Sequence, residues 1–495
     1  MVLIRGGLVV DGTGKPAFKA DILVRRDTIS AIGNFPRQGA DAVIDALGSY
    51  VMPGFIDVNT DSDHYLSLFT NPAQGSFLLQ GVTTTIGGNC GASLAPLLYG
   101  SLESIRKWAD VNRVNVGWHR MAEFLDTLER RGIGVNFGTL VGHATVRRAL
   151  IGSHFRDLTV KELSMFQQIL RAAMEEGAFG LSTGLGYVHA YGTPYAEIKN
   201  LAKIVAEMNG VYATHLRDET EGLVTAVTET ARVAEDTGVR TIISHFRPRI
   251  GFEEQFDRAR SLIEEMTDAD IHFDGNPHDT NLVPLYLLLP EWARIGSLDA
   301  MVSGLNESHL RAKIIDAFPD FKPEDIIIIE AQKARYLEGK TIGAFAENRN
   351  LGLKEALLAF MHLSKLRAIV LFRSVHGDLA IQSLLSEHAL VGSNTPSVPE
   401  YEHGWHEQFW NTFPKFIHTV TETKLMLLEA AIAKITSVPA KKFGIRNRGI
   451  LREGNAADLV LMRNGRITDV FVNGVRAVTS GVLKKSSAGK VLRRI

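Results

Sequence analysis

The sequence of 495 residues contains a single cysteine, Cys90. One cysteine cannot form a disulfide within the chain, which excludes a disulfide-stapled secreted scaffold and favours a reducing compartment. Long apolar runs are also missing, because the most apolar segments, such as 282–289, are far shorter than the roughly 18–20 residues of a membrane span. The N-terminus lacks the basic segment, apolar stretch and cleavage site of a secretory signal. We therefore expect a cytoplasmic protein that does not bind a membrane.

An excess of charge of either sign is missing as well. The 54 Lys and Arg residues nearly balance the 55 Asp and Glu residues, which gives a formal net charge of −1. This balance argues against nucleic acid as a partner, because nucleic-acid binding usually requires a basic surface. The hydrophobic content of 45% and the charged content of 22% are typical of globular proteins. The chain can therefore bury large cores.

Short β-prone runs separated by turn residues occupy both ends of the chain. Near the C-terminus an Asn-Gly pair at 473–474 lies between two apolar runs, which is a strong hairpin signal. We predict that residues 1–53 and 449–495 together form one small β-sandwich domain. Two unrelated β appendages are the alternative that the pattern leaves open.

Between these ends, short apolar strands alternate with amphipathic helical stretches such as 160–176 and 223–237. This alternation is typical of βα units and a parallel sheet. The predicted strands cover residues 54–58, 81–86, 136–141, 178–182, 210–214, 241–244, 271–273 and 389–392. We predict an α/β fold in which residues 54–448 form a (β/α)8 TIM barrel, with a helical insertion at about 290–351 before the last barrel strand.

Polar and metal-binding side chains follow the predicted strands, at the end of a barrel where active sites are found. Cys90, His215 and His245 each stand at such a strand end. One thiolate and two neutral imidazoles suit a zinc ion with a fourth position open for water. Cys90 taken alone would more often be a small buried apolar residue, so the metal prediction depends on the three residues together.

A second motif needs a different interpretation. The Gly-Leu-Ser-Thr-Gly segment at 180–184 matches the pattern of a serine nucleophile. That pattern requires a helix directly after the turn, and the residues that follow do not begin one. Ser182 is therefore a candidate for substrate binding rather than a nucleophile.

Several longer motifs carry a family resemblance that covers almost the whole chain. They lie at 53–58, 88–96, 140–143, 180–185, 212–217, 243–245, 436–440 and 449–459. The sequence resembles the amidohydrolase superfamily, and specifically its D-aminoacylase (N-acyl-D-amino-acid deacylase) branch. The Gly-Asn-Cys-Gly segment around Cys90 is diagnostic of that branch.

The resemblance implies a barrel, a small β domain from both termini and an inserted domain before the last strand. It also implies a zinc ion bound by Cys90, His215 and His245, with one tight site. The activity that it implies is hydrolysis of the amide bond of an N-acyl-D-amino acid, in which an aspartate on the last strand moves the proton.

The chain departs from the family pattern at several chemical positions. The family's His-x-His on the first strand is replaced by Asn59 and Asp61, and the general-base aspartate by Asn394. An amide does not accept a proton near neutral pH, so Asn394 can orient water without replacing the base. Arg247 stands where the family has a lysine, and His278 ends the segment that corresponds to Tyr-Pro-Tyr.

Roles for individual residues follow from these replacements. We expect Arg247 to receive a carboxylate of the substrate and His143 to orient a ligand or contact substrate. A second, weaker metal site would use the oxygens of Asn59 and Asp61. The remaining candidates are Asn394, Asp61 and Asp63 for catalysis, Ser182 and His278 for substrate binding, and Asp61, Asp63, His64 and His278 as alternative bases.

Three functions remain open from the sequence. The first is a zinc-dependent hydrolase of linear amides that uses another base, and the second is a catalytically impaired relative that binds or regulates. The third is hydrolysis of a cyclic amide, as in dihydroorotase or hydantoinase relatives, but these need a strand-four lysine that is absent at Ser182 and Thr183. The acyl group, the amino acid and the oligomeric state are not fixed, and the aromatic segment 401–410 is equally suited to a site entrance or to packing.

Overall fold

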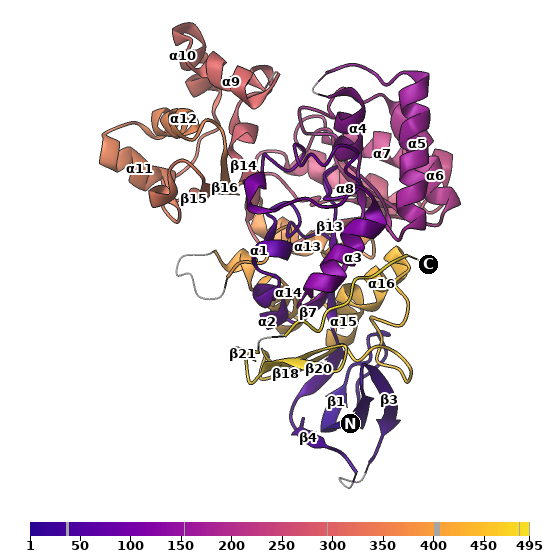
Figure 1. The fold of residues 1–495 in the computed structure, drawn as a ribbon. Coiled ribbons are helices and arrows are strands. Elements are labelled where there is room, and N and C mark those ends of the chain that lie inside the picture. Colours follow the sequence, from indigo (N-terminus) through magenta and orange to yellow (C-terminus); the bar gives the residue numbers. More distant parts are fainter. Residues whose placement is uncertain (36–38, 153, 295, 400–405, 485, 495) are drawn as a thin grey trace.

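The computed structural model of the protein describes residues 1–35, 39–152, 154–294, 296–399, 406–484 and 486–494. Residues 401–405 of the predicted entrance segment lie outside the described residues. Figure 1 shows the strands of both chain ends together at one end of the molecule, below a larger α/β body. No helix within the described ranges is long and apolar enough to cross a membrane.

The two termini share one nine-stranded sheet with the order β21-β20-β19-β18-β5-β1-β2-β3, and β4 pairs with β1. Its strands are β1 (Val2–Val9), β2 (Phe18–Arg25), β3 (Thr28–Gly33), β4 (Ala42–Asp45), β5 (Tyr50–Pro53), β18 (Leu459–Arg463), β19 (Arg466–Val472), β20 (Val475–Thr479) and β21 (Val482–Leu483). The antiparallel pair β5–β18 joins the two ends, with Met52 opposite Val460. Residues from both ends, including Ile22 and Leu459, belong to one apolar cluster, so neither end could bury its core without the other.

The body contains two parallel sheets, with the orders β17-β13-β12-β11-β10-β9 and β6-β7-β8. Their strands are β6 (Phe55–Asp57), β7 (Val82–Gly87), β8 (Asn136–Thr139), β9 (Val141–Gly142), β10 (Gly180–Gly184), β11 (Val211–His215), β12 (Arg240–Ile243), β13 (Ile271–Gly275) and β17 (Ala389–Val391). A strand lies at every predicted position. Only Leu140 separates β8, at the edge of one sheet, from β9, at the edge of the other. At the opposite edges, the N–H of Asn394, which follows β17, donates to the carbonyl of Asn59, which follows β6, at 2.9 Å. The two sheets therefore meet at both pairs of edges.

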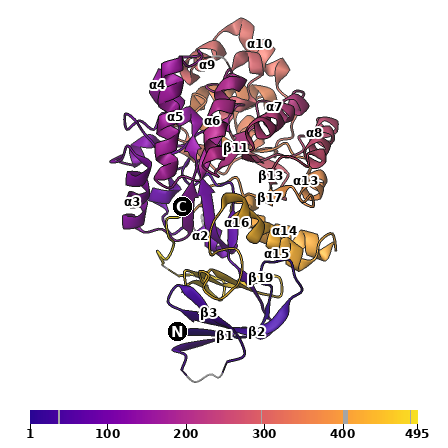
Figure 2. The same ribbon diagram turned by 90° about the vertical axis from the view of Figure 1, so that its right-hand side faces the viewer.

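Helices follow most of these strands, and Figure 2 shows α5, α6, α7 and α8 along the outside of β11 and β13. The helices of the body are α1 (Ser67–Thr70), α2 (Gly75–Leu79), α3 (Met121–Arg131), α4 (His143–Ile151), α5 (Val160–Glu175), α6 (Tyr195–Glu207), α7 (Leu223–Thr237), α8 (Glu253–Glu265), α13 (Gly377–Ser383), α14 (Thr412–Glu422), α15 (Leu428–Ile435) and α16 (Ser437–Phe443). Helix α5 illustrates why they form: Thr159 and Glu162 make a capping box, and Phe166 and Leu170 recur at helical spacing on the buried face.

The insertion differs from the prediction because it contains strands as well as helices. It holds α9 (Leu298–Leu305), α10 (Ser308–Ala317), α11 (Ile342–Arg349) and α12 (Leu353–Ser364), with the strands β14 (Thr280–Pro284), β15 (Ile326–Ala331) and β16 (Ala368–Arg373). The three strands form an antiparallel sheet in the order β14-β16-β15. Because β14 precedes residue 290 and β16 follows residue 351, this unit is wider than the predicted boundaries. It lies apart from α5–α8 in Figure 1.

Candidate metal centre

Cys90, His215 and His245 lie together at the carboxyl ends of β7, β11 and β12. The Sγ atom of Cys90 is 3.5 Å from Nε2 of His245, and Nδ1 of His215 is 2.8 Å from that same nitrogen. All three side chains are buried, with exposed fractions between 4% and 9%. Among the described residues this is the only group of three or more His, Cys, Asp and Glu side chains placed to hold a metal ion. We call these residues the trio.

The donor atoms of the trio suit zinc in their chemistry and spacing. Zinc–sulfur and zinc–nitrogen bonds of about 2.3 and 2.0 Å at tetrahedral angles would separate S from N by roughly 3.5 Å and N from N by roughly 3.3 Å. The first separation matches the Cys90–His245 distance, and the second exceeds the distance between the two imidazoles by a fraction of an ångström. Burial, followed by the neighbouring His245, lowers the pKa of His215 to about 3, so its ring is in the neutral form that binds metals.

A carboxylate outside the trio orients one of its ligands. The Nδ1 atom of His245 is 2.8 Å from Oε1 of Glu219, which also forms an ion pair with Arg249. Burial opposes a charge on His245, but Glu219 and Cys90 outweigh it and raise the pKa of His245 well above its usual value. An imidazole with one nitrogen on a carboxylate presents the other nitrogen as a fixed ligand. Sequence reasoning missed Glu219, although an acidic residue four positions after His215 was the available signal.

The loop that carries Cys90 is held by Ser182 and Asp63. The Ser182 hydroxyl donates to the Gly88 carbonyl and accepts the Gly91 N–H at 3.0 Å, and Oδ2 of Asp63 accepts the Gly88 N–H at 2.6 Å. Gly88 has φ +73°, and a Cβ there would lie 2.2 Å from the Leu140 carbonyl oxygen, so only glycine fits. Ser182 and Asp63 therefore hold the loop that carries Cys90, and their predicted roles in substrate binding and catalysis stay predictions.

Three non-glycine residues at these strand ends have left-handed backbone conformations. The φ angles are 52° for Cys90, 39° for His245 and 51° for Asn394. Such conformations cost on the order of 1–3 kcal/mol each and persist where the surrounding structure enforces them, often at functional sites. Because the three residues cluster, the backbone is held in an uncommon conformation at these ends of the strands.

Asn59, which follows β6, bonds to a carboxylate of β13. Its Nδ2 donates to both carboxylate oxygens of Asp274 at 3.2 Å, and Asp274 also accepts the His245 N–H at 3.0 Å. Burial raises the pKa of Asp274 to about 6 and that of the neighbouring Asp57 to about 7. Asn394 joins this region through its backbone bond to Asn59, and 8% of its surface is exposed.

Asp61 and His64 form a pair on the same side of the site. The two side chains meet at 2.9 Å, and the His64 ring stacks on Trp108 with centroids 4.2 Å apart. Burial opposes a charge on His64, but Asp63 and Asp61 outweigh it and raise its pKa to about 9. His64 is therefore protonated near neutral pH and is unsuited to act as a base. Asp61 keeps a side chain that is 10% exposed.

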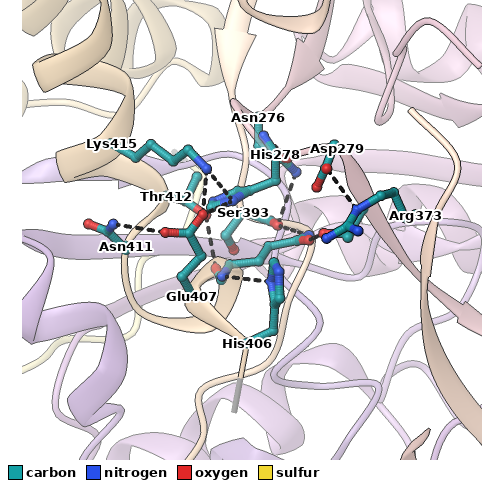
Figure 3. Close-up of polar contacts among 12 residues, drawn as sticks. Asn276, His278, Asp279, Arg373, Ser393, His406, Glu407, Asn411, Thr412 and Lys415 are labelled. Atoms are coloured by element: carbon teal, nitrogen blue, oxygen red, sulfur yellow. Dashed lines mark hydrogen bonds and ion pairs between the residues drawn. The ribbon is translucent and has the colours of Figure 1, made fainter. Parts of the chain in front are cut away.

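The Arg247 guanidinium donates to the His278 carbonyl at 3.4 Å. Figure 3 shows the surroundings of His278. The Arg247 guanidinium donates to Oδ1 of Asn276 at 2.7 Å and to the Thr280 carbonyl at 2.8 Å, and its Nε has no partner among the described residues. Burial lowers the pKa of Arg247 to about 9. The hydrogen-bond acceptors of this buried cation are an amide oxygen and backbone carbonyls, which are all neutral.

His278 has no exposed side-chain surface and lies in a cluster of polar side chains just after β13. Its ring nitrogens lie 3.2 Å from the Thr412 hydroxyl and 3.4 Å from the Lys415 ammonium, and Glu407 is 3.5 Å away. Burial lowers the pKa of His278 to about 4. These contacts join His278, which follows β13, to Glu407 and to two residues of α14, and its predicted role in substrate binding stays a prediction.

His143 is held by a buried carboxylate and an aromatic ring. Its Nε2 is 2.8 Å from Oε1 of Glu197, which Arg147 also contacts, and its ring stacks on Phe166 of α5. The residue has no exposed surface. Glu197 therefore fixes the ring through one nitrogen, and the expected role of His143 toward a ligand or substrate stays a prediction.

Comparison with known proteins adds full-length relatives. The chain is 31% identical to N-acyl-D-aspartate deacylase of Alcaligenes xylosoxydans xylosoxydans, with 94% of this chain and 86% of that protein covered. It is 29% identical to D-aminoacylase of the same organism, with 100% and 97% covered. No family model matches the chain.

A solved structure is similar over the same length. It is N-acyl-D-glutamate deacylase of Bordetella bronchiseptica in complex with zinc and a phosphonate inhibitor that mimics the tetrahedral intermediate of the reaction. The TM-score is 0.80 at 26% identity, and the match covers 100% of this chain and 99% of that one. With its trio, its α/β body and these full-length relatives, the chain belongs to the N-acyl-D-amino-acid deacylase family of metal-dependent amidohydrolases.

Proposed function

We propose that the protein is a zinc-dependent hydrolase of the linear amide bond in N-acyl-D-amino acids. The observation that carries this proposal is the buried trio of one thiol and two imidazoles at the strand ends of a full-length family member. A zinc ion held there supplies Lewis acidity toward a carbonyl oxygen and toward water. The other requirements, which are substrate binding and proton transfer, fall to side chains of this chain.

We infer that residues 54–448 form a (β/α)8 barrel with the insertion, and that residues 1–53 and 449–495 form the small β domain. Two observations support a closed barrel. Val58, Ile86 and Leu390, which accompany the first, second and last strands, belong to one apolar cluster. The Ser393 N–H also donates to Asp57 at 3.1 Å, which links the last strand to the first.

Asp61 is our candidate for the general base. Asn394 has an amide where the family has the aspartate, so it orients water and accepts no proton. Asp63 is bonded to the Gly88 N–H, and His64 is already protonated. Asp61 retains exposed side-chain surface, and the hydrogen bond with His64 fixes the orientation of its carboxylate.

Arg247 is our candidate for binding the α-carboxylate of the substrate. Its guanidinium is buried beside the end of β12, two residues after His245, and has only neutral acceptors in the described part of the chain. Glu219, Asp274 and Asp279 act on this cation without a hydrogen bond, so a substrate carboxylate would be its first charged acceptor, and a guanidinium suits a carboxylate in geometry.

The experiment has two readouts on the purified protein. Metal analysis should find one tightly bound zinc per chain, and this zinc should be lost in H215A and H245A but retained in H309A, a control histidine that is 69% exposed. A panel of N-acyl-D- and N-acyl-L-amino acids should show turnover of D substrates. D61N should then lower kcat about 10²- to 10⁴-fold with zinc content unchanged.

Other results would contradict the proposal in different ways. Zinc with no turnover on the panel would favour a catalytically impaired binding protein. Turnover that appears only in N394D, alone or with N59H and D61H, would show that the native site has lost its base. If C90A keeps both zinc and activity, the trio is not the metal site.

A further inference from the structure

Lys107 lies next to the trio with its ammonium group between two aromatic rings. Its Nζ is 3.9 Å from the ring centroid of Trp108 and 3.5 Å from that of Tyr187. The Tyr187 ring in turn packs on the His215 ring at a centroid distance of 4.5 Å. Lys107 is only partly buried. One aromatic ring therefore separates this charge from a residue of the trio, and the side chain still has accessible surface.

The positive charge of Lys107 has no carboxylate partner among the described residues. A second cation, Arg148 of α4, interacts with it electrostatically and likewise makes no ion pair in the described ranges. The acidic residue that interacts with Arg148 is Glu103, which pairs with Arg106 at 3.2 Å. Arg148 also lines a small hollow with His189, whose pKa is lowered to about 3 by burial and then by Arg148 and Lys107.

These cations destabilise one another. Burial, followed by repulsion from Arg148, lowers the pKa of Lys107 well below its usual value. Contact with two aromatic faces stabilises an ammonium but supplies no negative charge to offset the neighbouring cation. A carboxylate that entered here would relieve the repulsion and complete the charge balance.

We propose that Lys107, with Arg148 beside it, binds a second carboxylate of the substrate, separate from the α-carboxylate at Arg247. This inference rests on the proposed function. Lys107 follows β7 and Arg148 follows β9, whereas Arg247 follows β12, so the two cationic positions approach the trio from different strands. The second carboxylate belongs either to the amino-acid side chain or to a dicarboxylic acyl group, since both carry it a few bonds from the amide.

Matched substrate pairs test the inference. N-acetyl-D-glutamate against N-acetyl-D-glutamine varies the side chain, and N-succinyl-D-alanine against N-succinamoyl-D-alanine varies the acyl group. We expect wild type to favour the carboxylate member of one pair by about tenfold or more in kcat/KM, the range of a hydrogen bond to a charged group. K107M should lose most of that preference through KM and leave the neutral member within twofold of wild type.

Two control variants separate recognition from packing. K107R should keep the preference because it retains the charge, and K203M, which removes an exposed lysine of α6, should behave as wild type. Equal use of both members of both pairs by wild type would overturn the inference, as would an equal loss on both members in K107M. If no substrate is turned over, the proposed function fails. Calorimetric binding of the same four compounds to wild type and K107M then decides the role of Lys107 on its own.

Discussion

The contact between Glu219 and His245 gives a quantitative prediction about zinc affinity. Oε1 of Glu219 lies 2.8 Å from Nδ1 of His245, so the carboxylate fixes the ring while Nε2 faces Cys90 and His215. E219Q keeps the size and an acceptor oxygen but removes the charge. Loss of such a supporting carboxylate weakens metal binding about 10- to 100-fold, which corresponds to about 1.4–2.7 kcal/mol.

The chain offers a matched control for this variant. Glu229 pairs with Arg217 at 2.8 Å on α7, and both ion pairs are about equally exposed. Competition with a chromogenic chelator measures the zinc dissociation constant of each protein. We expect a 10- to 100-fold increase for E219Q and less than a twofold change for E229Q. Equal affinities for the two variants would refute the argument that Glu219 orients a zinc ligand.

Three further predictions concern the loop and the scaffold. S182A leaves the Gly88 carbonyl and the Gly91 N–H without their buried partner. It should therefore lower the free energy of unfolding by about 1–3 kcal/mol in chemical denaturation and weaken zinc binding. Unchanged zinc affinity would contradict the role of Ser182. F443A empties a site against Phe179 and should cost about 3–5 kcal/mol in the same assay, with zinc content unchanged. Burial raises the pKa of Glu330 to about 7, so the folded state holds a proton that the unfolded state has released above about pH 4.5. The contribution of Glu330 to stability should therefore fall as the pH rises from about 4.5 to 7, and E330Q should remove this contribution from melting curves recorded across this range.

The sequence predicted the parallel strands well because they depend on local signals. Each strand of the body combines an apolar run with a polar residue at its end, and β7 is buried along its whole length. Cys90 and the two histidines were proposed as ligands from residue type and strand-end position together with the family resemblance. Their distances of 3.5 and 2.8 Å then follow from the convergence of β7, β11 and β12 at one end of the sheets.

Other features depend on contacts that no local pattern reveals. Ser182 and His143 both end strands, yet Ser182 bonds to the Cys90 loop and His143 turns to Glu197. Lys107 lies in an aperiodic loop, and only the fold brings it to Tyr187. In the insertion a strand signal was present in the sequence but was not used. Four consecutive isoleucines at 326–329 favour a strand, and β15 forms there.

X-ray absorption at the zinc edge tests the central claim most directly. The chain has one cysteine, so a thiolate sulfur at about 2.3 Å from zinc can come only from Cys90. We expect zinc in the wild-type protein to have one sulfur neighbour and otherwise nitrogen or oxygen neighbours at about 2.0 Å. We expect the sulfur neighbour to be absent in C90A. A zinc ion bound in wild type with only nitrogen and oxygen neighbours would contradict the central claim.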